Sequence, residues 1–225
     1  MWRESSLLLV AVLALALLAA DVFPSGAQSD CLVVEDFANA KIGEFPADWK
    51  ARKDSGKEVY TVQEEAGKRF LRAVAKQIGI QAAKPYDTWD LKEYPVLAWS
   101  WRPMTFPPGS DERQSKTNDS ALAVYAVFPH SPVSVKSVKY VWSAVVPKDT
   151  HLTSSRGLTQ VRVVQTGTAR RGEWVEGRVN VAEDYKKYFG DGELPRPAGI
   201  AVLTDSDDTK STAEGDYANF RVCRG

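Results

Sequence analysis

The sequence predicts an all-β fold, a jelly-roll β-sandwich of about eleven strands with one short helix. Two observations predict it. Helical periodicity is nearly absent, and short runs rich in Val, Ile, Tyr, Phe and Trp are separated by Gly, Pro, Asp and Ser. Runs of this kind, repeated along a chain, are typical of antiparallel sandwiches and barrels.

The strands are placed by alternating or continuous apolar runs between turn residues. A short helix is expected over 180–190, because Asn180 can cap it, Glu183 follows three residues later, and Gly190 can end it. The expected strands cover residues 31–37, 58–63, 69–75, 78–83, 95–103, 119–128, 137–146, 160–167, 173–180, 198–204 and 217–223.

The N-terminal segment has the pattern of a secretory signal peptide. Arg3 precedes an unbroken apolar run over 7–20, and small residues follow up to Ala27. We expect residues 1–27 to be removed and residues 28–225 to form a single β-sandwich domain, periplasmic or secreted. The rival interpretation is a retained anchor, but this run is shorter than the roughly 20 residues that cross a bilayer. We expect no membrane span after cleavage.

The charge balance excludes one class of partner. The chain carries 29 basic and 29 acidic residues and has a formal net charge of +0. A near-neutral protein has no strong field to collect nucleic acid or anionic lipid. We therefore expect no nucleic-acid partner, and the oligomeric state is left open.

The only two cysteines, Cys31 and Cys223, lie at opposite ends of the predicted domain. Pairing the first and last strands antiparallel would bring them side by side, and an oxidising compartment would favour a disulfide. The alternative is two buried free thiols. Ligands so far apart in the chain do not suggest a zinc site.

Two of the expected strands have a face of small residues. In strand 119–128 that face carries Asp119 and Tyr125, and in strand 95–103 it carries Arg102. If these faces align, the three side chains share a groove. The alternative is a structural ion pair between Arg102 and Asp119.

A groove of this composition suits a glycan, because sugar rings stack on aromatic side chains while carboxylates and guanidinium groups bind hydroxyls. Trp142 would add an aromatic surface, and the polar loop 104–118 is long enough to suggest a role. The predicted ligand-binding residues are Arg102, Glu112, Arg113, Asp119, Tyr125, Trp142, Asp205 and Asp207.

The acidic segment 204–209, TDSDDT, allows three interpretations. Asp205 and Asp207 could supply oxygen ligands to Ca²⁺, although the glycine and distal glutamate of an EF-hand are missing. A catalytic pair would require an acid from elsewhere, Asp119 or Glu112. The third interpretation is a polar turn. No cofactor is expected to be required, and calcium is the metal that this loop would suit.

Several segments resemble a bacterial family, domain-of-unknown-function family 3047, over nearly all of the predicted domain. The resemblance implies a secreted or envelope location and a sandwich similar to carbohydrate-binding and concanavalin-like modules, and it brings no established activity. Asp208 stands where many relatives are expected to have an amide. The matching segments are Val34–Phe37, Phe45–Trp49, Trp99–Arg102, Asp111–Arg113, Tyr140–Trp142, Asp184–Tyr185 with Phe189–Gly190, and Thr204–Thr209.

The sequence is compatible with three functions. The first is a non-catalytic module that binds extracellular or envelope polysaccharide. The second is a hydrolase or lyase on the same substrates, with Glu112, Asp119 or Asp205 as the acid or base. The third is a structural or adaptor protein of the envelope.

Overall fold

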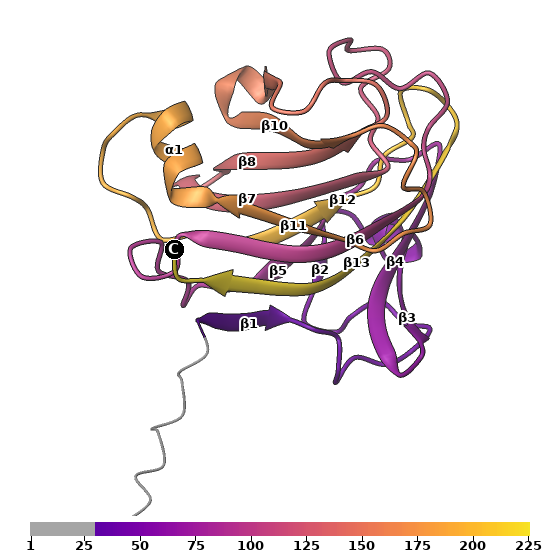
Figure 1. The fold of residues 1–225 in the computed structure, drawn as a ribbon, viewed down its shortest axis with the longest axis horizontal. Coiled ribbons are helices and arrows are strands. Elements are labelled where there is room, and N and C mark those ends of the chain that lie inside the picture. Colours follow the sequence, from indigo (N-terminus) through magenta and orange to yellow (C-terminus); the bar gives the residue numbers. More distant parts are fainter. Residues whose placement is uncertain (1–29) are drawn as a thin grey trace, which may run out of the picture.

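Two β-sheets are stacked face to face and one short helix lies beside them (Figure 1). This computed structural model describes residues 30–225, so the predicted signal peptide, residues 1–27, lies outside the described residues. In the described part of the chain, no helix is both long enough and apolar enough to cross a bilayer. The all-β sandwich with one helix is confirmed.

The first sheet has six strands in the order β11-β6-β13-β4-β3, and β1 pairs with β13 off this path. Its long strand β13 is central, because β1, β4 and β6 all pair with it antiparallel. The strands are β1 (Cys31–Glu35), β3 (Tyr60–Glu65), β4 (Lys68–Lys76), β6 (Val96–Thr105), β11 (Val175–Asn180) and β13 (Thr212–Cys223).

The second sheet has seven strands in the order β2-β5-β12-β7-β8-β10-β9. Its pairs are antiparallel except β8 and β10, which run parallel. Short 3₁₀ turns follow β2 and β9, at Asp54–Glu58 and Ser155–Gly157. The strands are β2 (Lys50–Ala51), β5 (Ala82–Pro85), β7 (Leu122–Ser131), β8 (Ser134–Ser143), β9 (His151–Ser154), β10 (Thr159–Thr166) and β12 (Gly199–Leu203).

Every predicted strand overlaps an observed one, and residues 30–225 contain thirteen strands rather than about eleven. The two additional strands are β2 and β9. They span two and four residues, and their sequences, KA and HLTS, carry no apolar alternation. Short edge strands of this kind are held by their neighbours rather than by a pattern of their own.

The core between the sheets is rich in aromatic rings. Trp99 and Trp101 of β6 meet edge to face with ring centroids 5.1 Å apart, and Trp101 lies 5.6 Å from the ring of Trp142 on β8. Gly177 on the adjacent strand β11 makes room for this cluster, because a β-carbon there would lie 2.4 Å from the Trp99 ring. Packed aromatic pairs of this geometry hold the two sheets in one arrangement.

The predicted helix is α1 (Val181–Phe189), and its caps follow the predicted pattern. The Asn180 side chain accepts a hydrogen bond from the backbone N–H of Glu183 at 3.1 Å, and Gly190 ends the helix with a positive φ of 101°. The Tyr185 ring packs 4.7 Å from the ring of Phe128 near the end of β7. The helix therefore covers one end of the core.

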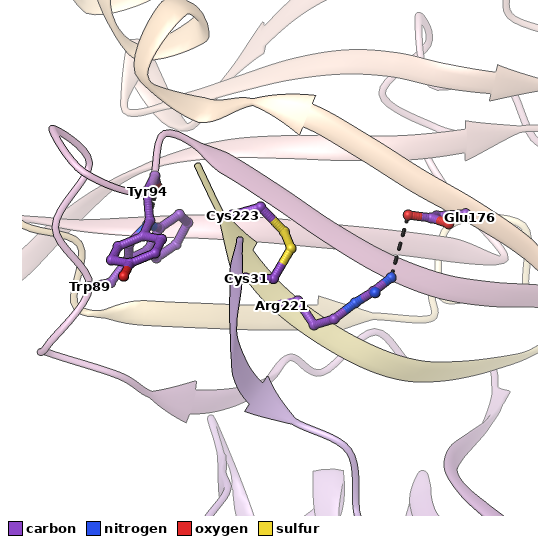
Figure 2. The surroundings of a disulfide bond; sticks show 6 residues. All are labelled: Cys31, Trp89, Tyr94, Glu176, Arg221 and Cys223. Atoms are coloured by element: carbon purple, nitrogen blue, oxygen red, sulfur yellow. Dashed lines mark hydrogen bonds and ion pairs between the residues drawn. A yellow bond between two sulfur atoms is a disulfide. The ribbon is translucent and has the colours of Figure 1, made fainter. Parts of the chain in front are cut away.

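The two ends of the described chain are joined. Cys31 pairs in register with Cys223, and a disulfide links them, as predicted (Figure 2). Nearby, Arg221 forms an ion pair with Glu176 of β11 at 3.4 Å. The bond fastens β1 to the central strand of the first sheet.

Candidate functional site

A groove runs over the outer face of the seven-stranded sheet. Two adjoining cavities of about 410 and 700 Å³ form it. It lies outside the core, because the strand residues that line it alternate with residues that face the other sheet, such as Val124 and Val202. Both cavities share the lining residues Arg52, Gln81, Tyr125, Ser155 and Thr159.

Four adjacent strands form the floor of the groove. Ala83 and Ala201 on β5 and β12 are small, so they leave room above the sheet, while Tyr125 and Lys139 rise from β7 and β8. The segment after β2 supplies one wall, and the turn between β9 and β10 supplies another. Side chains of the TDSDDT segment lie at one end of the groove.

Lys139 is the buried cation of this floor. It is directly opposite Tyr125 in register, is 6% exposed, and holds its Nζ 5.9 Å from the centroid of the Tyr125 ring. Burial acts to lower the pKa of the Lys139 ammonium, but attraction to Tyr125 and Asp205 outweighs burial and raises it. Lys139 is therefore positively charged at neutral pH.

Among the carboxyl groups, Asp205 has the largest effect on the pKa of Lys139. Burial raises the pKa of its carboxyl to about 8, a hydrogen bond with Asp207 acts in the same direction, and Lys139 opposes them. Its Oδ1 atom is buried and makes no hydrogen bond in the described structure. A β-carbon at Gly79 would lie 2.1 Å from Oδ1, so glycine is required beside this carboxyl. The Asp205 carboxyl therefore keeps its proton to a higher pH than an exposed aspartic acid does.

Replacing Asp205 by Asn is expected to flatten the dependence of stability on pH. The carboxyl pKa rises from 3.8 to about 8 on folding, so the folded state keeps a proton that the unfolded state releases. The stabilisation is complete below pH 4 and is lost as the pH rises toward 8. Between pH 4 and 9, the free energy of unfolding of the wild type, measured by urea denaturation, should fall by at least about 1–2 kcal/mol more than that of Asp205→Asn. If the difference between the two proteins stays constant over this pH range, the raised pKa is contradicted.

The side chain of Asp119 is fully buried and holds the TDSDDT segment in place through hydrogen bonds. It accepts hydrogen bonds from the backbone N–H of Asp208 at 3.1 Å, from that of Thr209 at 2.7 Å, and from the Thr209 hydroxyl. The sequence predicts Asp119 as a ligand-binding residue, whereas in the structure its carboxylate shapes the turn at the end of the groove. Its side chain does not line the groove.

Calcium remains a prediction for this segment. Within residues 30–225, one group of three carboxylates has oxygen atoms within 4.8 Å of one another, and it consists of Asp119, Asp207 and Asp208. The sequence predicted Asp205 with Asp207 instead, and Asp205 is outside this group. Carboxylate oxygens are the ligands that Ca²⁺ prefers, although those of Asp119 already accept bonds from the turn.

Arg102 does not share a groove with Tyr125, and the prediction that their small faces align is wrong. The reason is topological: β6 and β7 belong to different sheets, so their outward faces lie on opposite sides of the sandwich. Arg102 instead pairs with Asp216 at 2.7 Å and with Glu65 at 2.8 Å. The alternative ion pair with Asp119 is not formed either.

On that opposite face, Arg102 lies between two aromatic rings. Its guanidinium carbon is 5.3 Å from the centroid of Phe70 and 4.7 Å from that of Trp174. Trp174 is 37% exposed, so it is an aromatic side chain that a ligand on this side could reach. The stacking shows that Arg102 serves the packing of the six-stranded sheet.

The remaining predicted residues lie away from the groove. Glu112 is 7% exposed and accepts hydrogen bonds from the hydroxyls of Ser120 at 3.2 Å and Ser143 at 2.5 Å, which pins the loop 104–118 to β8. Arg113 forms a bidentate pair with Asp111 in the same loop. Neither residue reaches the groove.

Trp142 belongs to the core. It is 1% exposed, and its indole N–H donates to the carbonyl of Gly167 at 2.9 Å. The prediction that Trp142 lines a binding surface is therefore corrected, because β8 turns this side chain inward and turns Lys139 outward.

Lys139, Arg52 and Gln81 line the groove but are not among the residues predicted from the sequence. A signal for Lys139 was present: the inward aromatics on either side of Val141 fix the alternation of β8, which turns Lys139 to the same face as Tyr125. No such signal exists for Arg52 or Gln81, because both lie outside the strands and reach the groove through the course of their loops.

The comparisons with known proteins give one family and several distant folds. The model of a family described as "Protein of unknown function (DUF3047)" matches residues 47–221. No curated protein matches the sequence. Among solved structures, a carbohydrate-binding module of family 28, specific for non-crystalline cellulose, is 10% identical over 81% of this chain and 93% of its own, with a TM-score of 0.40.

Two further structures are of similar distance. A family 11 xylanase from Neocallimastix patriciarum is 12% identical over 81% of this chain and 98% of its own, with a TM-score of 0.38. An agarase is 12% identical over 87% of this chain, with a TM-score of 0.39, and this chain spans 24% of its length. Structural similarity this distant carries no argument about function. The function is therefore inferred from the groove.

Proposed function

Because this chain belongs to the DUF3047 family, whose description assigns no function, we propose a function from its own groove: non-catalytic binding of an extracellular or envelope polysaccharide. The observation that carries the proposal is the groove itself, a hollow of two adjoining cavities over four strands. Its two cavities have volumes within the range of about 300–1,000 Å³ that ligand sites occupy.

The chemistry of the lining suits a chain of sugars. Hydroxyl and amide groups of Gln81, Ser155 and Thr159 lie beside the ring of Tyr125, so hydrogen-bond donors and acceptors alternate with apolar surface. Sugars present the same mixture of hydroxyls and apolar ring faces. Two adjoining cavities can bind successive units of a polymer.

The burial of two of the predicted catalytic acids favours binding without catalysis. Glu112 and Asp119 are buried and accept hydrogen bonds within the protein. Glycoside hydrolysis by the usual route needs two carboxyl groups about 5–9 Å apart across the scissile bond. Of the three predicted catalytic acids, Asp205 is the one that lines the groove.

A hydrolase or lyase is the second candidate, and one observation favours it. The pKa of Asp205, about 8, would let this carboxyl donate a proton at neutral pH. Under this alternative, product formation should be abolished in Asp205→Asn. The binding proposal expects no reducing ends and no unsaturated products from any polysaccharide.

The groove is tested by affinity measurements on a panel of soluble neutral and acidic oligosaccharides, with and without calcium. At least one should bind saturably. Gln81→Ala and Tyr125→Phe each remove one polar group and should weaken that binding about fivefold to tenfold. Trp174→Ala, on the opposite face, is the matched control and should leave the affinity unchanged. Loss of binding in Trp174→Ala alone would place the site on the other sheet.

We also propose that the protein acts outside the cytoplasm, in the periplasm or beyond the cell. The Cys31–Cys223 disulfide supports this location, because such bonds persist in oxidising compartments. Fractionation of cells that express the full chain, followed by detection of the oxidised protein, tests it.

A further inference from the structure

We propose that the ligand is an acidic polysaccharide, a chain of uronate-type sugars whose carboxylates are bound by the cations of the groove. This inference rests on the proposed function and deepens it by naming the substrate class. It starts from the charged side chains that line the groove.

Four cations line the groove, and none of them forms an ion pair with any carboxylate in residues 30–225. Lys50, Arg52 and Lys53 stand exposed along one wall, and Lys139 is buried in the floor. The chain as a whole has no excess of positive charge. The positive lining is therefore a local feature of the groove.

Three other partly buried cations are paired with carboxylates: Arg102 Nη2 lies 2.7 Å from one, Lys84 Nζ lies 3.0 Å from one, and Arg162 Nη1 lies 3.1 Å from one. Lys139 is as buried as any of these and has no carboxylate within 4.0 Å. Its side chain contacts Tyr125 instead, so no carboxylate of the protein neutralises this ammonium and it is available to pair with the carboxylate of a ligand.

The acidic end of the groove does not neutralise this cation. Asp205 lines that end of the groove but forms no ion pair with Lys139. Asp208 lines the same end and is exposed. A sugar carboxylate is therefore expected to lie between Lys139 and the wall that carries Arg52 and Lys53, away from Asp208.

Direct contact between a carboxylate and these groups would form charge-assisted hydrogen bonds, which are stronger than neutral ones. A neutral polysaccharide would leave Lys139 without a carboxylate partner in the bound state. The groove therefore favours acidic over neutral polysaccharides, because the attraction between a cation and a carboxylate that pairs the other buried cations would also act on the ligand.

The test compares matched ligands. Oligogalacturonates, their methyl esters, oligomannuronates and neutral cello-oligosaccharides are titrated into the full mature protein at 50 and 500 mM salt. At least one acidic oligomer should bind about tenfold or more tightly than its neutral counterpart, and this preference should shrink at high salt. Equal affinity for acid and ester would overturn the inference and leave the proposed polysaccharide binding intact. No binding by any oligosaccharide would contradict the proposed function itself.

Substitutions in the groove test whether its cations cause the preference for acidic oligosaccharides. Lys139→Gln should lower the affinity for the acidic oligomer about tenfold or more, a larger factor than for its neutral counterpart. The double variant Arg52→Gln/Lys53→Gln changes two exposed residues and should also weaken acidic binding. The control is Lys186→Gln/Lys187→Gln, an exposed pair on α1 outside the groove. If this control weakens binding as much as the groove variants do, a diffuse surface charge and not the groove is responsible.

Discussion

Replacing Cys31 and Cys223 together by alanine is expected to lower the free energy of unfolding by about 5 kcal/mol. The disulfide joins residues separated by 192 positions, so it removes much of the conformational freedom of the unfolded chain. A loss of this size is a large part of the stability of a typical domain. Urea denaturation of the purified mature protein, followed by tryptophan fluorescence, measures it.

The wild-type protein under reducing conditions supplies the control for this experiment. Reduction breaks the same bond without changing side-chain volume, so its midpoint should agree with that of the double variant. Unchanged midpoints in both cases would show that β1 and β13 are held by pairing alone.

Replacing Asp216 by Asn is expected to lower the free energy of unfolding by about 3–5 kcal/mol. The Asp216 carboxylate is fully buried and binds two guanidinium groups, that of Arg72 at 2.7 Å and that of Arg102 at 2.7 Å. An amide cannot balance these two charges, and a buried charge without its partner is strongly destabilising. Thermal and urea denaturation both report this loss.

Glu65→Gln is the matched control, because it removes the other carboxylate that pairs with Arg102. The side chain of Glu65 is 60% exposed, so its loss should cost less than about 1 kcal/mol. If Asp216→Asn and Glu65→Gln lower the free energy of unfolding by the same small amount, a structural role for Asp216 and its two arginine partners is contradicted.

The fold could be predicted to a large extent, because local patterns determine it. Alternation fixed the strand positions, and the spacing of Asn180, Glu183 and Gly190 fixed the helix. Cysteines at the ends of the first and last strands were enough to predict the disulfide. The short strands β2 and β9 were missed because their stability comes from the strands beside them.

The candidate site could be predicted only in part. Tyr125 and Asp205 were both expected at a binding surface, and both line the groove. Arg102 was misplaced because a sequence shows which residues share a face of one strand, while the sheet that contains the strand depends on long-range pairing. Trp142 and Glu112 were misplaced because polar and aromatic side chains can be satisfied inside the fold.

The most direct test of the account is a map of ligand-induced chemical shifts in the amide and side-chain NMR spectra of the labelled protein. On titration with the tightest-binding oligosaccharide, the largest shifts should come from Tyr125, Lys139 and Gln81, with no response at Trp174. Shifts centred on Trp174 and Phe70, across the six-stranded sheet, would contradict the assignment of the groove as the binding site.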